Sequence, residues 1–184
     1  MRNLLILLAF TPCMLSAGQV PVCRKSNAHP NIDPVQEKCL AVTIYGEARG
    51  EPLRGKIAVA FTVVNRAKNT TLCSVVLAPK QYSIFNNNPA LRKAATSLHL
   101  DPEQRNIIDT SNWHESLKVA RLVMLKKVND PTKGATHYLS PNLMNQMGYE
   151  YPQWAKEYKR MAVIGSHEFY KYHKPVPVAV VGSL

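Results

Sequence analysis

Two carboxylates and an arginine lie between two glycines in residues 44–52, which read Ile-Tyr-Gly-Glu-Ala-Arg-Gly-Glu-Pro. Glu47 follows Leu40 by seven residues and Ile44 by three, so it extends an apolar stripe on one face of a helix. A carboxylate on such a face loses hydration, which disfavours its charged form and raises its pKa. The sequence therefore predicts that Glu47 stays protonated near neutral pH and acts as a general acid.

The second carboxylate, Glu51, precedes Pro52, which keeps the residue before it out of the α region. Gly50 weakens the helix at the same place. We expect one helix to end here and Glu51 to cap the next, and we also count Glu51 among the candidate substrate-binding residues. The alternative is a plain helix junction in which Arg49 and both glutamates face solvent.

Two helices are predicted to position Glu47. Asp33 is a good N-cap, Pro34 suits the first turn and Gln36 follows three residues after the cap, so the first helix begins near Asp33. The second helix is expected from about residue 52 to 68. Its expected buried face consists of Ile57, Ala60, Phe61 and Val64. Packing of the two helices would hold Glu47 at the corner between them.

The rest of the chain predicts an α+β fold, with core helices and a small antiparallel sheet. Residues 74–100 are expected to be rich in loops, and Asp101 to begin a short helix. Ser111 is expected to cap a longer helix. The predicted buried stripe of that helix is Leu117, Ala120, Met124 and Val128. Short strands are expected at 135–139, 161–164 and 167–170.

Two segments carry side chains suited to a sugar. Gln81, Tyr82 and Ser83 combine an aromatic face with amide and hydroxyl groups, which can contact the apolar face and polar edges of a saccharide. The alternative is an ordinary polar loop. The segment 149–154 holds two tyrosines and Trp154, which either line a saccharide cleft or close the core.

Charge indicates an anionic partner. The net charge is +11, and no Asp or Glu occurs from residue 52 to 100. The cations in that stretch are Arg54, Lys56, Arg66, Lys68, Lys80, Arg92 and Lys93. We expect no nucleic-acid partner, because no helix-turn-helix, RRM or KH signature accompanies the charge. Cysteine and histidine spacings match no zinc pattern, so we expect no metal site. We also expect no cofactor, and we expect the protein to be a monomer.

Residues 1–17 have the pattern of a secretory signal, with Arg2, an apolar run at 4–10 and small residues at 16–17. We expect cleavage after Ala17 and a secreted or periplasmic protein, whose membrane contact is limited to this segment. The alternative is a retained signal-anchor. The expected organisation is a signal at 1–17, an irregular arm at 18–33, a catalytic domain at 34–174 and an extended tail at 175–184.

Export makes the cysteines informative, because disulfides persist in oxidising compartments. Cleavage of the signal would remove Cys13 and leave Cys23, Cys39 and Cys73. An odd set predicts one bridge and one free thiol. A bridge from Cys23 to either other cysteine would tie the N-terminal arm to the body, and the sequence leaves the pairing open.

Five ordered segments carry a family resemblance. They are 46–51 (Gly-Glu-Ala-Arg-Gly-Glu), 64–66 (Val-Asn-Arg), 81–83 (Gln-Tyr-Ser), 134–138 (Gly-Ala-Thr-His-Tyr) and 164–170 (Ile-Gly-Ser-His-Glu-Phe-Tyr). Over about residues 35–172 the chain resembles the SleB-type cell wall hydrolases, a spore cortex-lytic and phage-associated family. The resemblance implies a fold related to lysozymes and lytic transglycosylases, action on peptidoglycan and Glu47 as the catalytic acid.

By this resemblance, Glu47 protonates the leaving oxygen of the MurNAc–GlcNAc bond and then helps the sugar's own 6-hydroxyl close a 1,6-anhydro ring. Tyr138 and Gln81 are expected to orient the N-acetyl group or the acid. A two-carboxylate glycosidase needs a partner roughly 5–9.5 Å from the acid, and the acid-free stretch supplies none. The alternatives are a hydrolytic muramidase and a non-catalytic basic wall-binding protein. The candidate second carboxylates for the muramidase are Glu150, Glu157 and Glu168.

Overall fold

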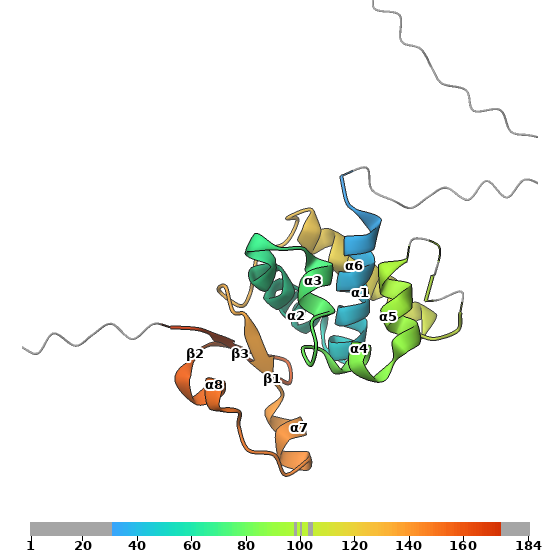
Figure 1. Ribbon diagram of the computed structural model, residues 1–184. Helices are drawn as coiled ribbons and strands as arrows, with labels where there is room; N and C mark the ends of the chain where they lie inside the picture. Colours follow the sequence, from blue (N-terminus) through green and yellow to red (C-terminus); the bar gives the residue numbers. More distant parts are fainter. Residues whose placement is uncertain (1–30, 98, 100, 103–104, 174–184) are drawn as a thin grey trace, which may run out of the picture.

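Helix α1 (Pro34–Ala48) is the central element of the protein, whose computed structural model describes residues 31–97, 99, 101–102 and 105–173 (Figure 1). Asp33 caps the helix as predicted, because its carboxylate accepts a hydrogen bond from the Val35 N–H at 2.8 Å. All seven residues from Cys39 to Tyr45 are buried. The prediction of a single buried face is therefore wrong, since other helices cover α1 on every side.

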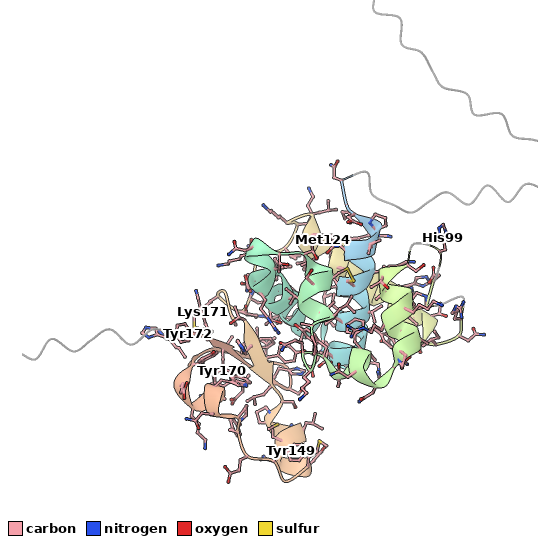
Figure 2. All side chains as sticks on the ribbon, in the orientation of Figure 1. His99, Met124, Tyr149, Tyr170, Lys171 and Tyr172 are labelled. Atoms are coloured by element: carbon pink, nitrogen blue, oxygen red, sulfur yellow. A yellow bond between two sulfur atoms is a disulfide. The ribbon has the colours of Figure 1, made fainter. Side chains whose placement is uncertain are left out.

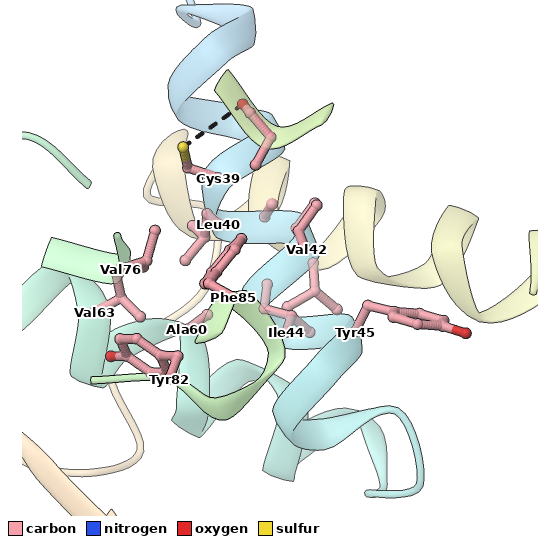
Figure 3. Packing of buried hydrophobic residues seen from close by; sticks show 14 of the residues in the cluster. Cys39, Leu40, Val42, Ile44, Tyr45, Ala60, Val63, Val76, Tyr82 and Phe85 are labelled. Atoms are coloured by element: carbon pink, nitrogen blue, oxygen red, sulfur yellow. Dashed lines mark hydrogen bonds between the residues drawn. The ribbon is translucent and has the colours of Figure 1, made fainter. Parts of the chain in front are cut away.

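The helices packed around α1 are α2 (Leu53–Arg66), α3 (Leu72–Val76), α4 (Ser83–Asn87), α5 (Pro89–Thr96) and α6 (Thr110–Met124), with a 3-10 turn at Ala67–Asn69. Figure 3 shows Leu40 and Ile44 of α1 among side chains from α2, α3 and α4. Tyr45 points to the other side of the helix, where its hydroxyl accepts a hydrogen bond from the Asp109 N–H at 3.1 Å. These contacts form the main hydrophobic core.

The prediction that residues 74–100 are rich in loops is wrong, because α4, α5 and much of α3 lie there. Local caps explain these short helices. The Thr71 hydroxyl accepts a hydrogen bond from the Ser74 N–H at 3.1 Å, and the Asn88 side chain accepts one from the Leu91 N–H at 3.1 Å. Pro89 then occupies the first turn of α5, where its fixed φ suits a helix start.

Two further helix predictions need correction. Asp109, and not Ser111, caps α6, because its carboxylate accepts the Asn112 N–H at 2.9 Å. The fully buried residues of α6 are Trp113, Ser116, Val119, Ala120 and Val123, so the predicted stripe shares only Ala120 with them. The short helix expected from Asp101 falls partly on residues 103–104, outside the described residues, and Arg105 beyond them lies in a turn.

Helix α2 also buries more than the predicted face. Ala60 is buried as expected, whereas Ile57, Phe61 and Val64 are only half-buried. Ala58 and Val59 belong to a second, smaller core that includes Phe169. The helix is buried on two sides because it packs against α1 and against the sheet.

The sheet contains β1 (His137–Leu139), β2 (Lys159–Ile164) and β3 (His167–Lys171) in the antiparallel order β1-β3-β2. Helices α7 (Pro141–Gln146) and α8 (Gln153–Glu157) connect β1 to β2, and together these elements form a lobe beside the helical core (Figure 1). The predicted strands and the α+β fold class are confirmed. Tyr149, Tyr170 and Tyr172 all lie in this lobe, away from His99 and Met124 (Figure 2).

A disulfide joins Cys39 of α1 to Cys73 of α3. One bridge was expected, and this pair is one that the sequence left open. Cys23, the signal, most of the N-terminal arm and the tail fall within 1–30 and 174–184, outside the described residues. In the part of the chain that is described, no helix has both the length and the apolar character needed to cross a membrane.

Candidate active site

A cavity of about 390 Å³ lies where the helical core meets the sheet lobe, within the size range typical of ligand pockets. Its lining residues are Glu47, Arg66, Lys80, Gln81, Tyr82, Thr136, His137, Tyr138 and Trp154. They come from α1, α2, the segment before α4, the edge strand β1 with Thr136 just before it, and α8. The fold thus brings Glu47 together with four of the six predicted substrate-binding residues, which lie far apart in the sequence. The four are Gln81, Tyr82, Tyr138 and Trp154.

Glu47 is the only carboxylate among the described residues that line this cavity. The Tyr138 hydroxyl donates to its Oε2 at 3.0 Å, and the Ser83 hydroxyl donates to its Oε1 at 3.4 Å. Burial raises the pKa of Glu47 above its ordinary value, and it outweighs the hydrogen bonds from Tyr138, Ser83 and the Ile84 N–H, which lower it. This carboxyl group is therefore suited to donate a proton at higher pH than a solvated glutamic acid.

Gly46 allows α4 to approach the end of α1 closely. A Cβ at Gly46 would lie 2.6 Å from the Cβ of Ile84, a distance that packed atoms do not tolerate. Ser83 and Ile84 stand at the start of α4 and both donate hydrogen bonds to Glu47. Because Gly46 has no side chain, the Ser83 hydroxyl and the Ile84 N–H can come close enough to donate hydrogen bonds to Glu47.

Tyr138 is fixed against Glu47 by its neighbours in the sheet. Its ring meets His167 edge to face with centroids 5.2 Å apart, and the Phe169 centroid lies 5.9 Å away. Burial and the nearby Glu47 raise the pKa of Tyr138 well above its ordinary value. The phenol therefore keeps its proton and remains a donor to the acid.

Arg66 organises the opposite wall. Its guanidinium donates to the Gln81 side-chain oxygen and to the Tyr82 hydroxyl, the latter at 3.4 Å. The same guanidinium lies 5.8 Å from the centre of the Tyr82 ring. Arg66 thus holds two predicted substrate contacts, Gln81 and Tyr82, in place.

His137 and Trp154 form an aromatic wall. Their ring centroids are 5.1 Å apart, and Tyr158 packs on His137 at 5.0 Å. Burial and the charge of Arg66 lower the pKa of His137, so this ring is neutral near neutral pH. Sequence reasoning missed Lys80, Thr136 and His137 as lining residues. Thr136 and His137 belong to segment 134–138, which carries part of the family resemblance and could have pointed to them.

Two predicted contacts lie elsewhere. Ser83 bonds Glu47 but does not line the cavity wall. Glu51 does not reach the cavity, and the prediction that it caps α2 is wrong, because Pro52 occupies the N-cap without a side-chain hydrogen bond. The carboxylate of Glu51 instead accepts hydrogen bonds from the backbone N–H and hydroxyl of Ser166.

The three candidate second carboxylates are also occupied or remote from the cavity. Glu168 pairs with Arg160 at 2.8 Å and accepts a hydrogen bond from Tyr170. The Glu150 side chain is 93% exposed, and Glu157 accepts a hydrogen bond from Gln153. None of the three lines the cavity.

Few of the cations between residues 52 and 100 reach the site. Arg66 and Lys80 line the cavity, whereas Lys56 is buried in an ion pair with Glu115 and Arg92 donates to the Leu77 carbonyl at 2.6 Å. Of the cations in this acid-free stretch, only Arg66 and Lys80 therefore bring positive charge to the cavity wall. Within the described ranges, no three His, Cys, Asp or Glu side chains gather in a way that could hold a metal ion.

The family model described as cell wall hydrolase matches residues 50–170. The spore cortex-lytic enzyme of Oceanobacillus iheyensis is 26% identical over 138 residues, which cover 72% of this chain and 40% of that enzyme. The spore cortex-lytic enzyme of Bacillus subtilis is 26% identical over 108 residues, 57% of this chain and 29% of that enzyme. The chain thus spans less than half the length of these relatives.

Two solved structures share the fold. The catalytic domain of the germination-specific lytic transglycosylase SleB from Bacillus anthracis superposes with a TM-score of 0.54 at 22% identity, covering 78% of this chain and all of that domain. The catalytic domain of Bacillus cereus SleB gives 0.51 at 21% identity, covering 85% and 100%. The predicted lysozyme-like helical core with a small antiparallel sheet is confirmed. Glu47 lies just before the matched residues 50–170.

Proposed function

The chain belongs to the cell wall hydrolase family, as its sequence resemblance predicted, and from this we propose that it cleaves the glycan strands of peptidoglycan with Glu47 as general acid. One observation carries the proposal. Glu47 is a partly buried carboxyl group with a raised pKa, held by the Tyr138 hydroxyl in a cavity where the lining residues supply no other carboxylate.

The proposed reaction is lytic transglycosylation. Protonated Glu47 donates its proton to the oxygen between MurNAc and GlcNAc, and the bond from that oxygen to C1 of MurNAc breaks as positive charge develops at C1. The 6-hydroxyl of the same MurNAc then bonds to C1 and gives its proton to the Glu47 carboxylate. This restores the acid, closes a 1,6-anhydro ring and consumes no water.

The carboxylate inventory favours this route over hydrolysis. A two-carboxylate glycosidase needs its second carboxyl group within roughly 5–9.5 Å of the acid. Glu47 is the only carboxylate among the described residues that line the cavity, and Glu168 already interacts with Arg160 and Tyr170. A nucleophile supplied by the sugar itself removes the need for a second carboxylate.

The remaining walls suit a peptidoglycan strand. His137 and Trp154 offer apolar ring surface for a sugar face, and the Gln81 amide can hydrogen-bond an N-acetyl group. Arg66 and Lys80 place positive charge on the cavity wall, where it can pair with a lactyl or peptide carboxylate of the strand. A peptidoglycan substrate lies outside the cytoplasm, which agrees with the proposed secretory signal at 1–17.

Lysis of purified peptidoglycan sacculi by Glu47→Gln tests the acid. We expect this variant to fold and to lose about 10²- to 10⁴-fold in rate, the usual contribution of general acid–base catalysis. Glu150→Gln is the matched control, because that side chain is 93% exposed and outside the cavity. Lysis by Glu47→Gln at the control's rate would overturn the proposal.

A further inference from the structure

The geometry points to Glu51 as a positioning residue, which fastens the hairpin between β2 and β3 to the corner between α1 and α2 and thereby holds Tyr138 on Glu47. This inference rests on the proposed function for its catalytic consequence. The contact itself is a feature of the fold that can be tested without any measurement of activity.

Glu51 grips the tip of the hairpin with both carboxylate oxygens. The Ser166 N–H donates to Oε2 at 3.0 Å, and the Ser166 hydroxyl donates to Oε1. His167 Nδ1 lies 3.6 Å from Oε1. The side chains of Glu51 and His167 are only 11% and 9% exposed, whereas Ser166 at the tip of the hairpin is exposed. Hydrogen bonds to a carboxylate are stronger than those between neutral groups, so the mostly buried Glu51 can hold the exposed hairpin tip.

Gly165 makes this close contact sterically feasible. Its φ of +59° suits the first position of a two-residue hairpin turn between Ile164 and His167. A Cβ at Gly165 would lie 1.8 Å from Oε2 of Glu51. The hairpin can therefore meet the carboxylate only because residue 165 lacks a side chain.

The rings of His167 and Tyr138 connect the hairpin to Glu47. His167, the first residue of β3, meets the Tyr138 ring edge to face at 5.2 Å. The Tyr138 hydroxyl donates to Glu47 at 3.0 Å. A continuous series of contacts thus runs from Glu47 through Tyr138 and His167 to Glu51. Glu47 and Glu51 are also joined directly by the backbone at the corner between α1 and α2.

A second attachment keeps the sheet lobe in place when the first is cut. The Asn65 side chain of α2 donates to the Asp130 carboxylate at 2.9 Å and to the Ala135 carbonyl at 3.0 Å, just before β1. Loss of the Glu51 contact should therefore let the hairpin end of the lobe shift without unfolding it. A shift of about 1 Å in a positioned group can cost on the order of 100-fold in rate.

Glu51→Ala removes the contact, and Glu51→Gln is the matched variant that loses the same charge but can still accept the Ser166 N–H. We expect Glu51→Ala to lower kcat about 10- to 100-fold with little change in KM, and Glu51→Gln to restore most of the rate. In the Tyr138→Phe background, Glu51→Ala should cost little more, because the hydrogen bond that it protects is already gone.

The pKa of Glu47, followed by NMR of its labelled carboxyl carbon, gives a readout independent of lysis. The Tyr138 hydrogen bond lowers this pKa, so Glu51→Ala should raise it in the same direction as Tyr138→Phe. Simple loss of a negative charge at residue 51 would instead lower the pKa of Glu47. Glu51→Gln, which loses that charge but keeps the grip, should show no rise.

The inference is overturned if Glu51→Ala leaves both the Glu47 pKa and kcat unchanged, or if its cost is fully additive with Tyr138→Phe. Should Glu51→Ala not fold, Gly165→Ala breaks the same contact from the hairpin side while retaining the Glu51 charge, and the same results are expected of it. If the wild-type protein does not lyse sacculi but Glu51→Ala still raises the pKa of Glu47, the proposed function is contradicted and the positioning role of Glu51 stands.

Discussion

Replacing Gly46 with alanine should separate Glu47 from two of its three hydrogen-bond donors. The new methyl group would meet Ile84 Cβ at 2.6 Å, Cγ1 at 2.7 Å and Cγ2 at 2.9 Å. These atoms sit near the start of α4 on a β-branched side chain and cannot all move aside, so the start of α4 must shift away from α1. Ser83 and the Ile84 N–H would move with it.

The magnitude follows from two opposing effects. Overpacking of this kind costs typically about 1–3 kcal/mol, and alanine gains about 1 kcal/mol over glycine within a helix. The expected net loss of stability for Gly46→Ala is therefore about 0–2 kcal/mol, which lowers Tm by up to about 8 °C in a chain of this size. Misplacement of the acid's donors should reduce the rate of sacculus lysis about 10- to 100-fold.

Thermal unfolding and sacculus lysis should be measured on Gly46→Ala and Gly50→Ala in parallel. Gly50 is the matched control, because a Cβ there meets nothing within 4 Å. We expect the Gly50 variant to behave as wild type. If Gly46→Ala were equally stable and equally active, the close approach of α4 would have no part in positioning the acid.

Three further predictions concern the site and its support. Tyr138→Phe removes a hydrogen bond that lowers the pKa of Glu47, and since the acid works protonated, the alkaline fall in kcat/KM should move to higher pH. Lys80→Glu should weaken sacculus binding and flatten its dependence on salt, whereas Lys118→Glu, exposed on α6 and outside the cavity, should not. Cys73→Ser opens a bridge spanning 34 residues and should lower the free energy of unfolding by about 3–4 kcal/mol, measured by urea titration.

Local signals predicted the parts of the site that depend on neighbouring residues. The cap at Asp33 and the apolar residues that follow it were enough to predict a helix ending near Glu47 and a desolvated carboxyl group there. The same logic failed at α5, where the Asn88 cap and Pro89 were present but the surrounding asparagines suggested a loop.

Contacts between distant segments were beyond the reach of sequence periodicity. Glu51 was expected to cap α2, yet its partner Ser166 is 115 residues away. Local pattern also gave no sign that the face of α2 with Ala58 and Val59 would meet the sheet, because that depends on how the lobe folds back. The pairing of Cys39 with Cys73 was open for the same reason.

The masses of the muropeptides released from purified peptidoglycan test the central claim most directly. Attack by the sugar's own 6-hydroxyl leaves a 1,6-anhydro end that is one water lighter than the reducing end left by hydrolysis. We predict that the wild-type chain releases anhydro products and that Glu47→Gln releases almost none. A digest with only reducing ends would contradict the transglycosylase reaction, and unchanged release by Glu47→Gln would contradict Glu47 as the acid.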